Sequence, residues 1–156
     1  MVPPKPLRAK LGGRMAPRVE PPSEPAKKQV LFVCIGNSCR SQMAEAFARA
    51  YGSDVMEASS AGLSPAMIIA PMTRRVLSEK NISIDGQFPK DLDSFPRASL
   101  DIVVNLSGVS LALPGARVIE WPVRDPIGES DEVYRTVANE IEGLVMRFIL
   151  ELRSAR

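Results

Sequence analysis

The sequence predicts a single α/β domain of three layers, in which a four-stranded parallel sheet carries helices on both faces. Short apolar runs typical of buried strands, above all 30–33 and 101–106, alternate with longer segments whose apolar residues recur every three to four positions. Strands that alternate with helices in this way form parallel sheets covered by helices. At 156 residues the chain is long enough for one such domain with its own core.

The first predicted strand and the first predicted helix follow one another closely. The strand covers residues 29–34, and the helix covers residues 40–51 with an inner apolar stripe at Met43, Ala44, Phe47, Ala48 and Tyr51. The loop between them contains Gly36 and Asn37, which tolerate the tight or left-handed backbone that a short connection needs. Ligands bind such sheets at the carboxyl ends of the strands, so this loop is the predicted binding site.

The remaining elements are predicted in order along the chain. They are a strand at 55–59, a helix at 71–79, a loop with a short helix at 81–100, strands at 101–106 and 117–121, and a long helix at 131–153. Ser130 is the expected N-cap of the last helix. The small residues from Ser59 to Gly62, which follow the second strand as a turn, let that turn lie close to the loop after the first strand.

Residues 1–28 differ in composition from the rest. They contain seven of the fourteen prolines, and seven lysines and arginines against two glutamates, with no apolar periodicity. This composition predicts a disordered, Pro-rich, basic N-terminal arm, followed by the α/β domain at 29–156. We interpret the arm as a solvated extension, or as a result of an upstream start with Met15 or a later residue near the true one. A basic tether to nucleic acid or to an acidic surface is the less favoured alternative.

The composition excludes several classes of protein. No apolar run approaches the 18 or so residues of a membrane span, and no secretion signal is apparent. Two cysteines, five positions apart in one loop, do not form the disulfide framework of a secreted fold, so a cytoplasmic location is expected. The sequence has no histidine, which excludes Ser-His-Asp and Cys-His catalysis and histidine-ligated metal sites. We expect no metal or organic cofactor.

The predicted loop reads Cys34-Ile35-Gly36-Asn37-Ser38-Cys39-Arg40 and has the spacing Cys-x5-Arg. Between a strand and a helix, the N–H groups of residues 35–40 can point at one centre, where the helix dipole adds positive potential. A cysteine in this setting is stabilised as the thiolate, and Ser41 could donate its hydroxyl to the sulfur. Arg40 can hold two oxygens of a tetrahedral anion. We therefore predict that Cys34 attacks phosphate or a similar anion; a buried core cysteine beside an ordinary arginine is the alternative.

This stretch, which continues as Ser-Gln-Met-Ala-Glu, resembles the phosphate loop of the low-molecular-weight protein tyrosine phosphatase superfamily, which includes arsenate reductases. The resemblance runs from about Gln29 to the C-terminus, includes the motif Trp121-Pro-Val-Arg-Asp-Pro126, and implies a phosphotyrosine protein phosphatase I-like fold. It implies that Asp125 is the general acid, which protonates the leaving oxygen and then activates water to hydrolyse a phosphocysteine. An Asp-Pro pair that only starts a turn is the alternative.

Two departures from the family pattern concern the substrate. Tyrosine-specific members carry an aromatic residue just after the Asp-Pro pair, where this chain has Ile127-Gly128-Glu129. A less aromatic surround resembles the arsenate reductase branch. Those reductases need resolving cysteines near the third strand, however, and the matching stretch 105–113 has none. An intramolecular thiol cascade through that stretch is therefore excluded.

The resemblance also bears on three other side chains. It implies that Cys39 could form a reversible disulfide with Cys34 that shields the nucleophile from oxidation; a small buried residue that merely fits is the alternative. Asn37 and Glu45 match positions that some relatives use around a potassium ion or in a network that orients the loop. For Asn37 we expect the orienting role.

We therefore predict a cysteine-dependent phosphatase that hydrolyses phosphate monoesters, with protein phosphotyrosine as the expected substrate, through a phosphocysteine intermediate. An arsenate reductase that uses an external thiol or redoxin is the first alternative, and a catalytically weak oxyanion-binding regulatory module is the second. The expected partner is a phosphorylated protein or a small oxyanion, joined by an external thiol reductant in the reductase case. No membrane or nucleic-acid partner is expected.

Overall fold

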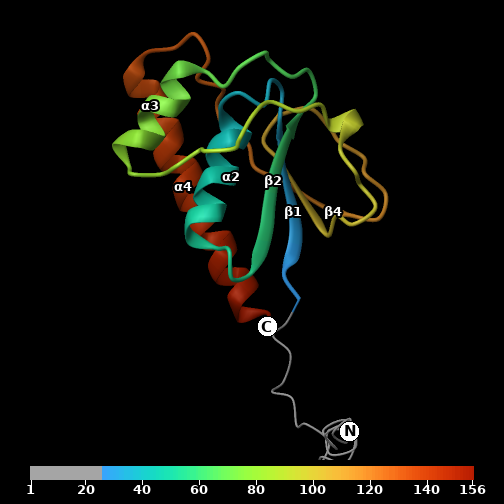
Figure 1. Ribbon diagram of the computed structural model, residues 1–156. Helices are drawn as coiled ribbons and strands as arrows, with labels where there is room; N and C mark the ends of the chain where they lie inside the picture. Colours follow the sequence, from blue (N-terminus) through green and yellow to red (C-terminus); the bar gives the residue numbers. More distant parts are fainter. Residues whose placement is uncertain (1–25) are drawn as a thin grey trace, which may run out of the picture.

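The computed structural model describes residues 26–156, which form a four-stranded parallel sheet with the strand order β2-β1-β3-β4. The strands are β1 (Lys28–Cys34), β2 (Met56–Gly62), β3 (Ile102–Asn105) and β4 (Arg117–Glu120). The helices are α2 (Arg40–Tyr51), α3 (Pro71–Glu79), the 3-10 helix η1 (Leu92–Ser94) and α4 (Asp131–Ser154) (Figure 1). The predicted α/β domain with a four-stranded parallel sheet is confirmed. The predicted N-terminal arm lies almost wholly outside the described residues.

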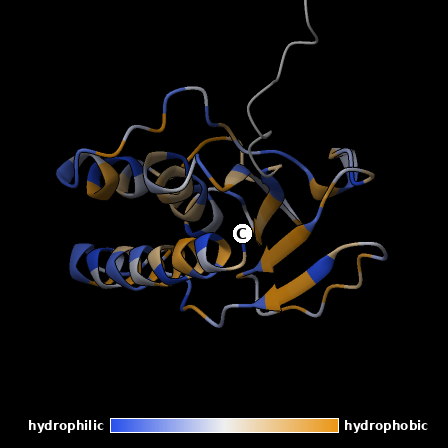
Figure 2. Ribbon diagram, turned by 90° about the horizontal axis from the view of Figure 1, so that it is seen from below, coloured by the Kyte–Doolittle hydropathy of each residue, from blue (hydrophilic) through white to orange (hydrophobic). Residues whose placement is uncertain are grey.

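Both faces of the sheet are covered, but unequally (Figure 2). The side chains of Val30 and Phe32 join a core with α2, α3 and α4 on one face, because successive residues of a strand point to opposite sides. Those of Leu31 and Val33 face η1 and the neighbouring loops on the other side. Only a short helix forms there because the stretch between α3 and β3 contains prolines, which interrupt helices. Since β1 is buried on both faces, it reads as one continuous apolar run.

The long helix α4 fixes the connection that follows β4. Its N-cap is Ser130, whose hydroxyl accepts a hydrogen bond from the N–H of Val133 over 3.3 Å, as the sequence predicts. Trp121, just after β4, packs between Phe32 and Phe148, with ring centroids 5.9 Å from each. The connection from 122 to 129 is therefore held at both ends and lies near the carboxyl ends of β1 and β3. No helix in the described part of the chain is both long and apolar enough to cross a membrane.

Candidate active site

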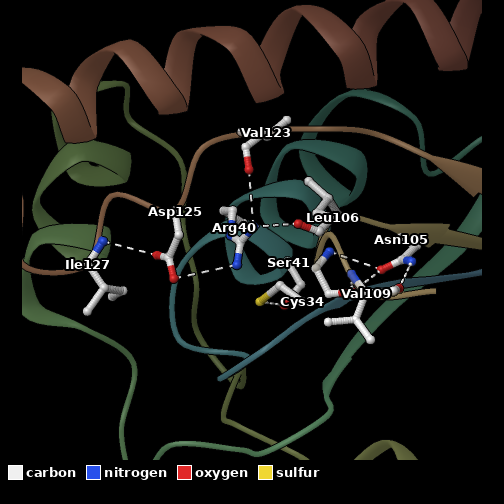
Figure 3. A network of polar contacts seen from close by, with 10 residues as sticks. Cys34, Arg40, Ser41, Asn105, Leu106, Val109, Val123, Asp125 and Ile127 are labelled. Carbon is white, nitrogen blue, oxygen red and sulfur yellow. Dashed lines mark hydrogen bonds and ion pairs between the residues drawn. The ribbon is translucent and has the colours of Figure 1, made fainter. Parts of the chain in front are cut away.

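A pocket of about 240 Å³ lies where β1 ends and α2 begins. It brings together the three predicted catalytic side chains, Cys34, Arg40 and Asp125, although Asp125 comes from the connection between β4 and α4 (Figure 3). The other residues that line it are Ile35, Gly36, Ser38, Cys39, Ala66 and Ile127. The predicted binding loop therefore supplies most of the residues that line the pocket. Asn37 is the one loop residue that does not line it.

The carbonyl groups of this loop all have partners within the protein. Four of them accept hydrogen bonds of 2.8 to 3.1 Å from N–H groups of the segment 63–70, namely the carbonyls of Cys34, Ile35, Gly36 and Ser38. The carbonyl of Asn37 accepts from Nε2 of Gln42 over 2.9 Å. The carbonyl of Cys39 accepts from the N–H of Met43 over 2.8 Å. The loop is thus anchored by its carbonyl oxygens from residue 34 to residue 39.

The N–H groups of the same loop differ from its carbonyl groups in their hydrogen bonding. Within residues 26–156, the backbone N–H groups of residues 35–40 donate no hydrogen bond to the protein. The N-cap of α2, Cys39, makes no side-chain capping bond, so the first turn of that helix also keeps free donors. Buried N–H groups require an acceptor, and a helix N-terminus favours a negative one. The loop can therefore bind an oxyanion with several backbone donors at once.

Gly62 lets the end of β2 lie directly against this loop. A Cβ atom at this position would lie 2.7 Å from the carbonyl oxygen of Ile35 and 2.9 Å from Cβ of Asn37, both closer than real contacts allow. The composition of Ser59 to Gly62 predicts a turn beside the loop. In the structure these residues are the last part of β2, paired with β1 as far as Cys34. The close approach arises from this pairing.

A directed chain of three hydrogen bonds ends on the nucleophile. The backbone N–H of Lys90 donates to Oδ1 of Asn37 over 2.9 Å, so the amide nitrogen of Asn37 faces the other way. That nitrogen, Nδ2, donates to Oγ of Ser41 over 2.7 Å. Ser41 Oγ lies 2.9 Å from Cys34 Sγ. Since Asn37 is a donor to the serine oxygen, the hydrogen of Ser41 is not drawn to Asn37 and can be donated to the sulfur.

Arg40 is buried, and backbone carbonyls hold its guanidinium in place. Its Nη1 donates to the carbonyl of Leu106 over 2.5 Å and to that of Val123 over 3.1 Å, while Nη2 lies 3.5 Å from Oδ2 of Asp125 (Figure 3). Leu106 is itself held in a turn closed by Asn105, whose Nδ2 donates to the carbonyl of Val109 over 2.7 Å. The guanidinium of Arg40 is therefore fixed by the segments that follow β3 and β4, and Arg40 lines the pocket.

The Asp125 carboxylate lies at the mouth of the pocket, with its side chain about half exposed. Its Oδ1 accepts a hydrogen bond from the N–H of Ile127 over 3.0 Å, which fixes the carboxylate across the intervening Pro126. Its second oxygen faces Arg40. A carboxyl group in this place can exchange protons with solvent and reach an oxygen of an anion that is bound over Cys34.

Cys39 has a different environment from Cys34. Burial raises the pKa of its thiol to about 12, although a hydrogen bond with Thr73 acts in the opposite direction. The hydroxyl of Thr73 also donates to the carbonyl of Ser38 over 2.9 Å, which ties α3 to the loop. At neutral pH Cys39 is therefore a protonated thiol and does not compete with Cys34 as a nucleophile. Its role in a protective disulfide stays a prediction.

Two buried glutamines support the loop and were not among the predicted site residues. Gln42 donates from Nε2 to the carbonyls of Asn37 and Phe88, over 2.9 and 3.1 Å. Gln87 donates to Oε1 of Gln42 over 2.7 Å. The sequence offers one sign of the supporting role of Gln42: it is a polar residue beside Met43, at the start of a helix that faces the core. Glu45 takes no part in this network: Ser60 donates to its carboxylate, and Arg49 pairs with it at 2.7 Å.

The fold and the loop at the end of β1 are those of a cysteine-based, phosphatase-like enzyme superfamily. The chain belongs to the low molecular weight phosphotyrosine protein phosphatase family, whose model matches residues 29–156. It is 35% identical to a glutaredoxin arsenate reductase of Synechocystis sp. over 130 residues, which are 80% of this chain and 98% of that protein.

Two solved structures are similar to the whole domain. One is an arsenate reductase in the phosphate binding state, with a TM-score of 0.73 and 35% identity over 80% of this chain and 98% of that one. The other is the arginine phosphatase YwlE from Geobacillus stearothermophilus, with a TM-score of 0.72 and 25% identity over 82% and 94%. Relatives of similar fold thus carry names of two different activities.

Proposed function

We propose that the protein is an arsenate reductase that takes its electrons from a thiol outside the chain. The observation that carries the proposal is the pocket over Cys34, which is about 240 Å³ in volume and is lined by Ala66 and Ile127 besides the loop residues and Asp125. Such a pocket suits a free tetrahedral oxyanion, and none of its lining residues is aromatic. Relatives named arsenate reductase, 34 to 35% identical over nearly their whole lengths, support the same choice. The favoured function is thus the reductase, which in the sequence analysis is the first alternative to the phosphatase.

In the first step the Cys34 thiolate attacks the arsenic of arsenate. The free N–H groups of residues 35–40 and the guanidinium of Arg40 hold the remaining oxygens. An S–As bond forms and one As–O bond breaks. The departing oxygen takes a proton from Asp125 and leaves as water. Arsenic stays in the oxidation state +5, bound to Cys34.

In the second step an external thiolate attacks Sγ of Cys34. An S–S bond forms, and the S–As bond breaks with its electron pair moving to arsenic, which leaves as arsenite in the oxidation state +3. The two sulfur atoms supply the two electrons and become a mixed disulfide. A second thiol then attacks the outer sulfur and releases Cys34 as the thiolate.

Both of these thiols have to come from outside because the chain offers no suitable one. Its only cysteines are Cys34 and Cys39. Cys39 is buried in the same loop, with its pKa raised to about 12, so almost none of it is thiolate at neutral pH.

The proposal is tested by following arsenite release from arsenate, with dithiothreitol, glutathione, thioredoxin and glutaredoxin each supplied as reductant to the full chain. We expect turnover with at least one of them, and its loss to background in Cys34→Ser. Ser83→Ala, which alters an exposed serine that does not line the pocket, is the matched control and keeps full activity. Wild-type protein that releases no arsenite with any of the four reductants contradicts the proposal.

Hydrolysis of phosphate monoesters is the second candidate. It is favoured by the position of Asp125 at the pocket mouth, where one carboxylate can serve as acid and then as base for water. A small aryl phosphate is the test substrate. If its turnover depends on Cys34 while arsenite release does not occur, the phosphatase assignment replaces the reductase. Phosphate binding without either reaction would indicate an oxyanion-binding module.

A further inference from the structure

Three exposed apolar side chains lie on the two segments that contribute Ala66 and Ile127 to the pocket. Met67 is 97% exposed, Ile68 is 65% exposed and Ile127 is 49% exposed. Ile127 lines the pocket, and so does Ala66, the neighbour of Met67. We call Met67, Ile68 and Ile127 the apolar rim. Exposed apolar side chains that gather at one place mark sites of interaction with another molecule.

The rim is also uncharged and firmly placed. The stretch from 63 to 72 reads Leu-Ser-Pro-Ala-Met-Ile-Ile-Ala-Pro-Met and contains no charged residue. Hydrogen bonds from the N–H groups of Ala66 and Ala70 to the carbonyls of Gly36 and Ser38, of 2.8 and 3.0 Å, fix it on the catalytic loop. Inside the mouth, the charges of Arg40 and Asp125 face one another. An incoming molecule therefore meets an apolar surface of no net charge.

We propose that this rim docks a protein dithiol of the redoxin type, which delivers the external thiol to Cys34. The proposal rests on the proposed function. Cys34 is only 3% exposed, so the thiol has to enter through the mouth and pass the rim. A small thiol such as glutathione carries two carboxylates and one ammonium group, for which the rim offers no charged partner. A protein whose reactive cysteine lies in an apolar surface instead buries the rim side chains on docking.

The chemistry of this delivery balances within the partner. The first cysteine thiolate of the partner attacks Cys34 Sγ in the arsenic adduct, and arsenite leaves with the electron pair of the S–As bond. The mixed disulfide holds the two proteins together while the partner's second thiolate attacks the partner's own first sulfur. Cys34 departs as the thiolate and the partner departs as its disulfide. One dithiol is oxidised for each arsenate reduced.

The experiment compares the reductants on the full chain and on the double variant Met67→Glu, Ile68→Glu. Leu150→Glu is the control, because Leu150 is an apolar residue on α4 that is 56% exposed and lies far from the pocket. With thioredoxin or glutaredoxin, we expect kcat/KM for the redoxin to fall at least about tenfold in the double variant. With dithiothreitol, arsenite release and the KM for arsenate stay unchanged. The control behaves as the wild type with every reductant.

A trapped complex gives a second readout. A redoxin in which the second cysteine is serine can form the mixed disulfide but cannot resolve it. We expect this species to accumulate with the wild type in the presence of arsenate, and to form at least about tenfold more slowly with the double variant.

The possible failures can be told apart. If dithiothreitol supports turnover and the redoxins drive the double variant as well as the wild type, the docking proposal is overturned and the reductase proposal stands. The same holds if glutathione serves the wild type better than either redoxin. If no reductant, dithiothreitol included, supports turnover by the wild type, the reductase proposal itself fails.

Discussion

Asn37 donates a hydrogen bond of 2.7 Å from its side-chain amide to the hydroxyl oxygen of Ser41. This bond decides what Ser41 does for Cys34. A serine hydroxyl has one hydrogen, and it is available to the sulfur as long as the group on the other side of the serine oxygen is a donor and not a competing acceptor. The backbone of Lys90 holds the Asn37 amide in the required orientation. The polarity around the nucleophile is therefore set by a residue that does not line the pocket.

Replacing Asn37 by aspartate tests this directionality. A carboxylate of the same shape tolerates the left-handed backbone at this position, where φ is 48°, but it cannot donate to Ser41. The serine hydrogen then turns to the carboxylate and leaves the sulfur. We expect Asn37→Asp to lower kcat by roughly 10- to 100-fold, the value of one hydrogen bond to a charged group, and Ser41→Ala to lower it as much. The rate of Cys34 alkylation by iodoacetamide should fall in parallel. Activity in Asn37→Asp equal to the wild type would exclude the directed chain.

The substitution Asp125→Asn should remove proton transfer while it keeps the conformation of the turn at 125–127. The amide oxygen of asparagine can still accept from the N–H of Ile127 and so keeps the turn, whereas the proton for the departing oxygen is lost. We expect kcat for arsenite release with dithiothreitol to fall by about 10²- to 10⁴-fold, as for other general acids. Glu129→Gln removes a neighbouring carboxylate, which pairs with Arg124, and should leave the rate unchanged. A decrease of less than about threefold in Asp125→Asn would remove Asp125 from the mechanism.

Gly62→Ala and Gly143→Ala should act in opposite directions. A methyl group at position 62 meets the carbonyl oxygen of Ile35 at 2.7 Å, so β2 or the catalytic loop has to move. Overpacking of this kind costs about 1 to 3 kcal/mol of unfolding free energy, and the displaced loop should lose activity as well. Gly143 lies on α4, where an added methyl group would meet open space, and alanine there should stabilise the helix by up to about 1 kcal/mol. Urea denaturation measures both, and a Gly62→Ala protein as stable as the wild type would contradict the close approach.

The ion pair between Asp54 and Arg153 should contribute to stability in a way that changes with pH only below about pH 4. Two hydrogen bonds of 2.9 and 2.8 Å from Arg153 lower the pKa of Asp54 from its ordinary value of 3.8 to about 2. The contribution is therefore complete above about pH 4 and is lost as the pH falls through about 2. Since the side chains are exposed to solvent, it is small. In urea denaturation, Asp54→Asn should be less stable than the wild type at pH 7 and equal to it near pH 2. A difference that stays constant over this range would contradict it.

Local chemistry predicts the ends of α2 and α3 to the residue, because a polar loop precedes one helix and Pro71 begins the other. It does not predict the end of β2. Ser60, Ala61 and Gly62 read as a turn by composition, yet they continue the strand because β1 lies beside them and pairs with them. Cys34, Arg40 and Asp125 could be named from their motifs. The carbonyl partners of Arg40, at Leu106 and Val123, depend on the order of strands in the sheet, which no local pattern encodes.

The anchoring of the catalytic loop by the segment 63–70 has a consequence for how this protein can diverge. All four hydrogen bonds that join the two segments run between backbone atoms. They impose no chemical identity on the side chains at positions 67 and 68, which are exposed. Mutation can therefore exchange these exposed residues while the N–H donors around Cys34 keep their places. Related proteins can in this way keep the same loop around the cysteine while the surface beside it diverges.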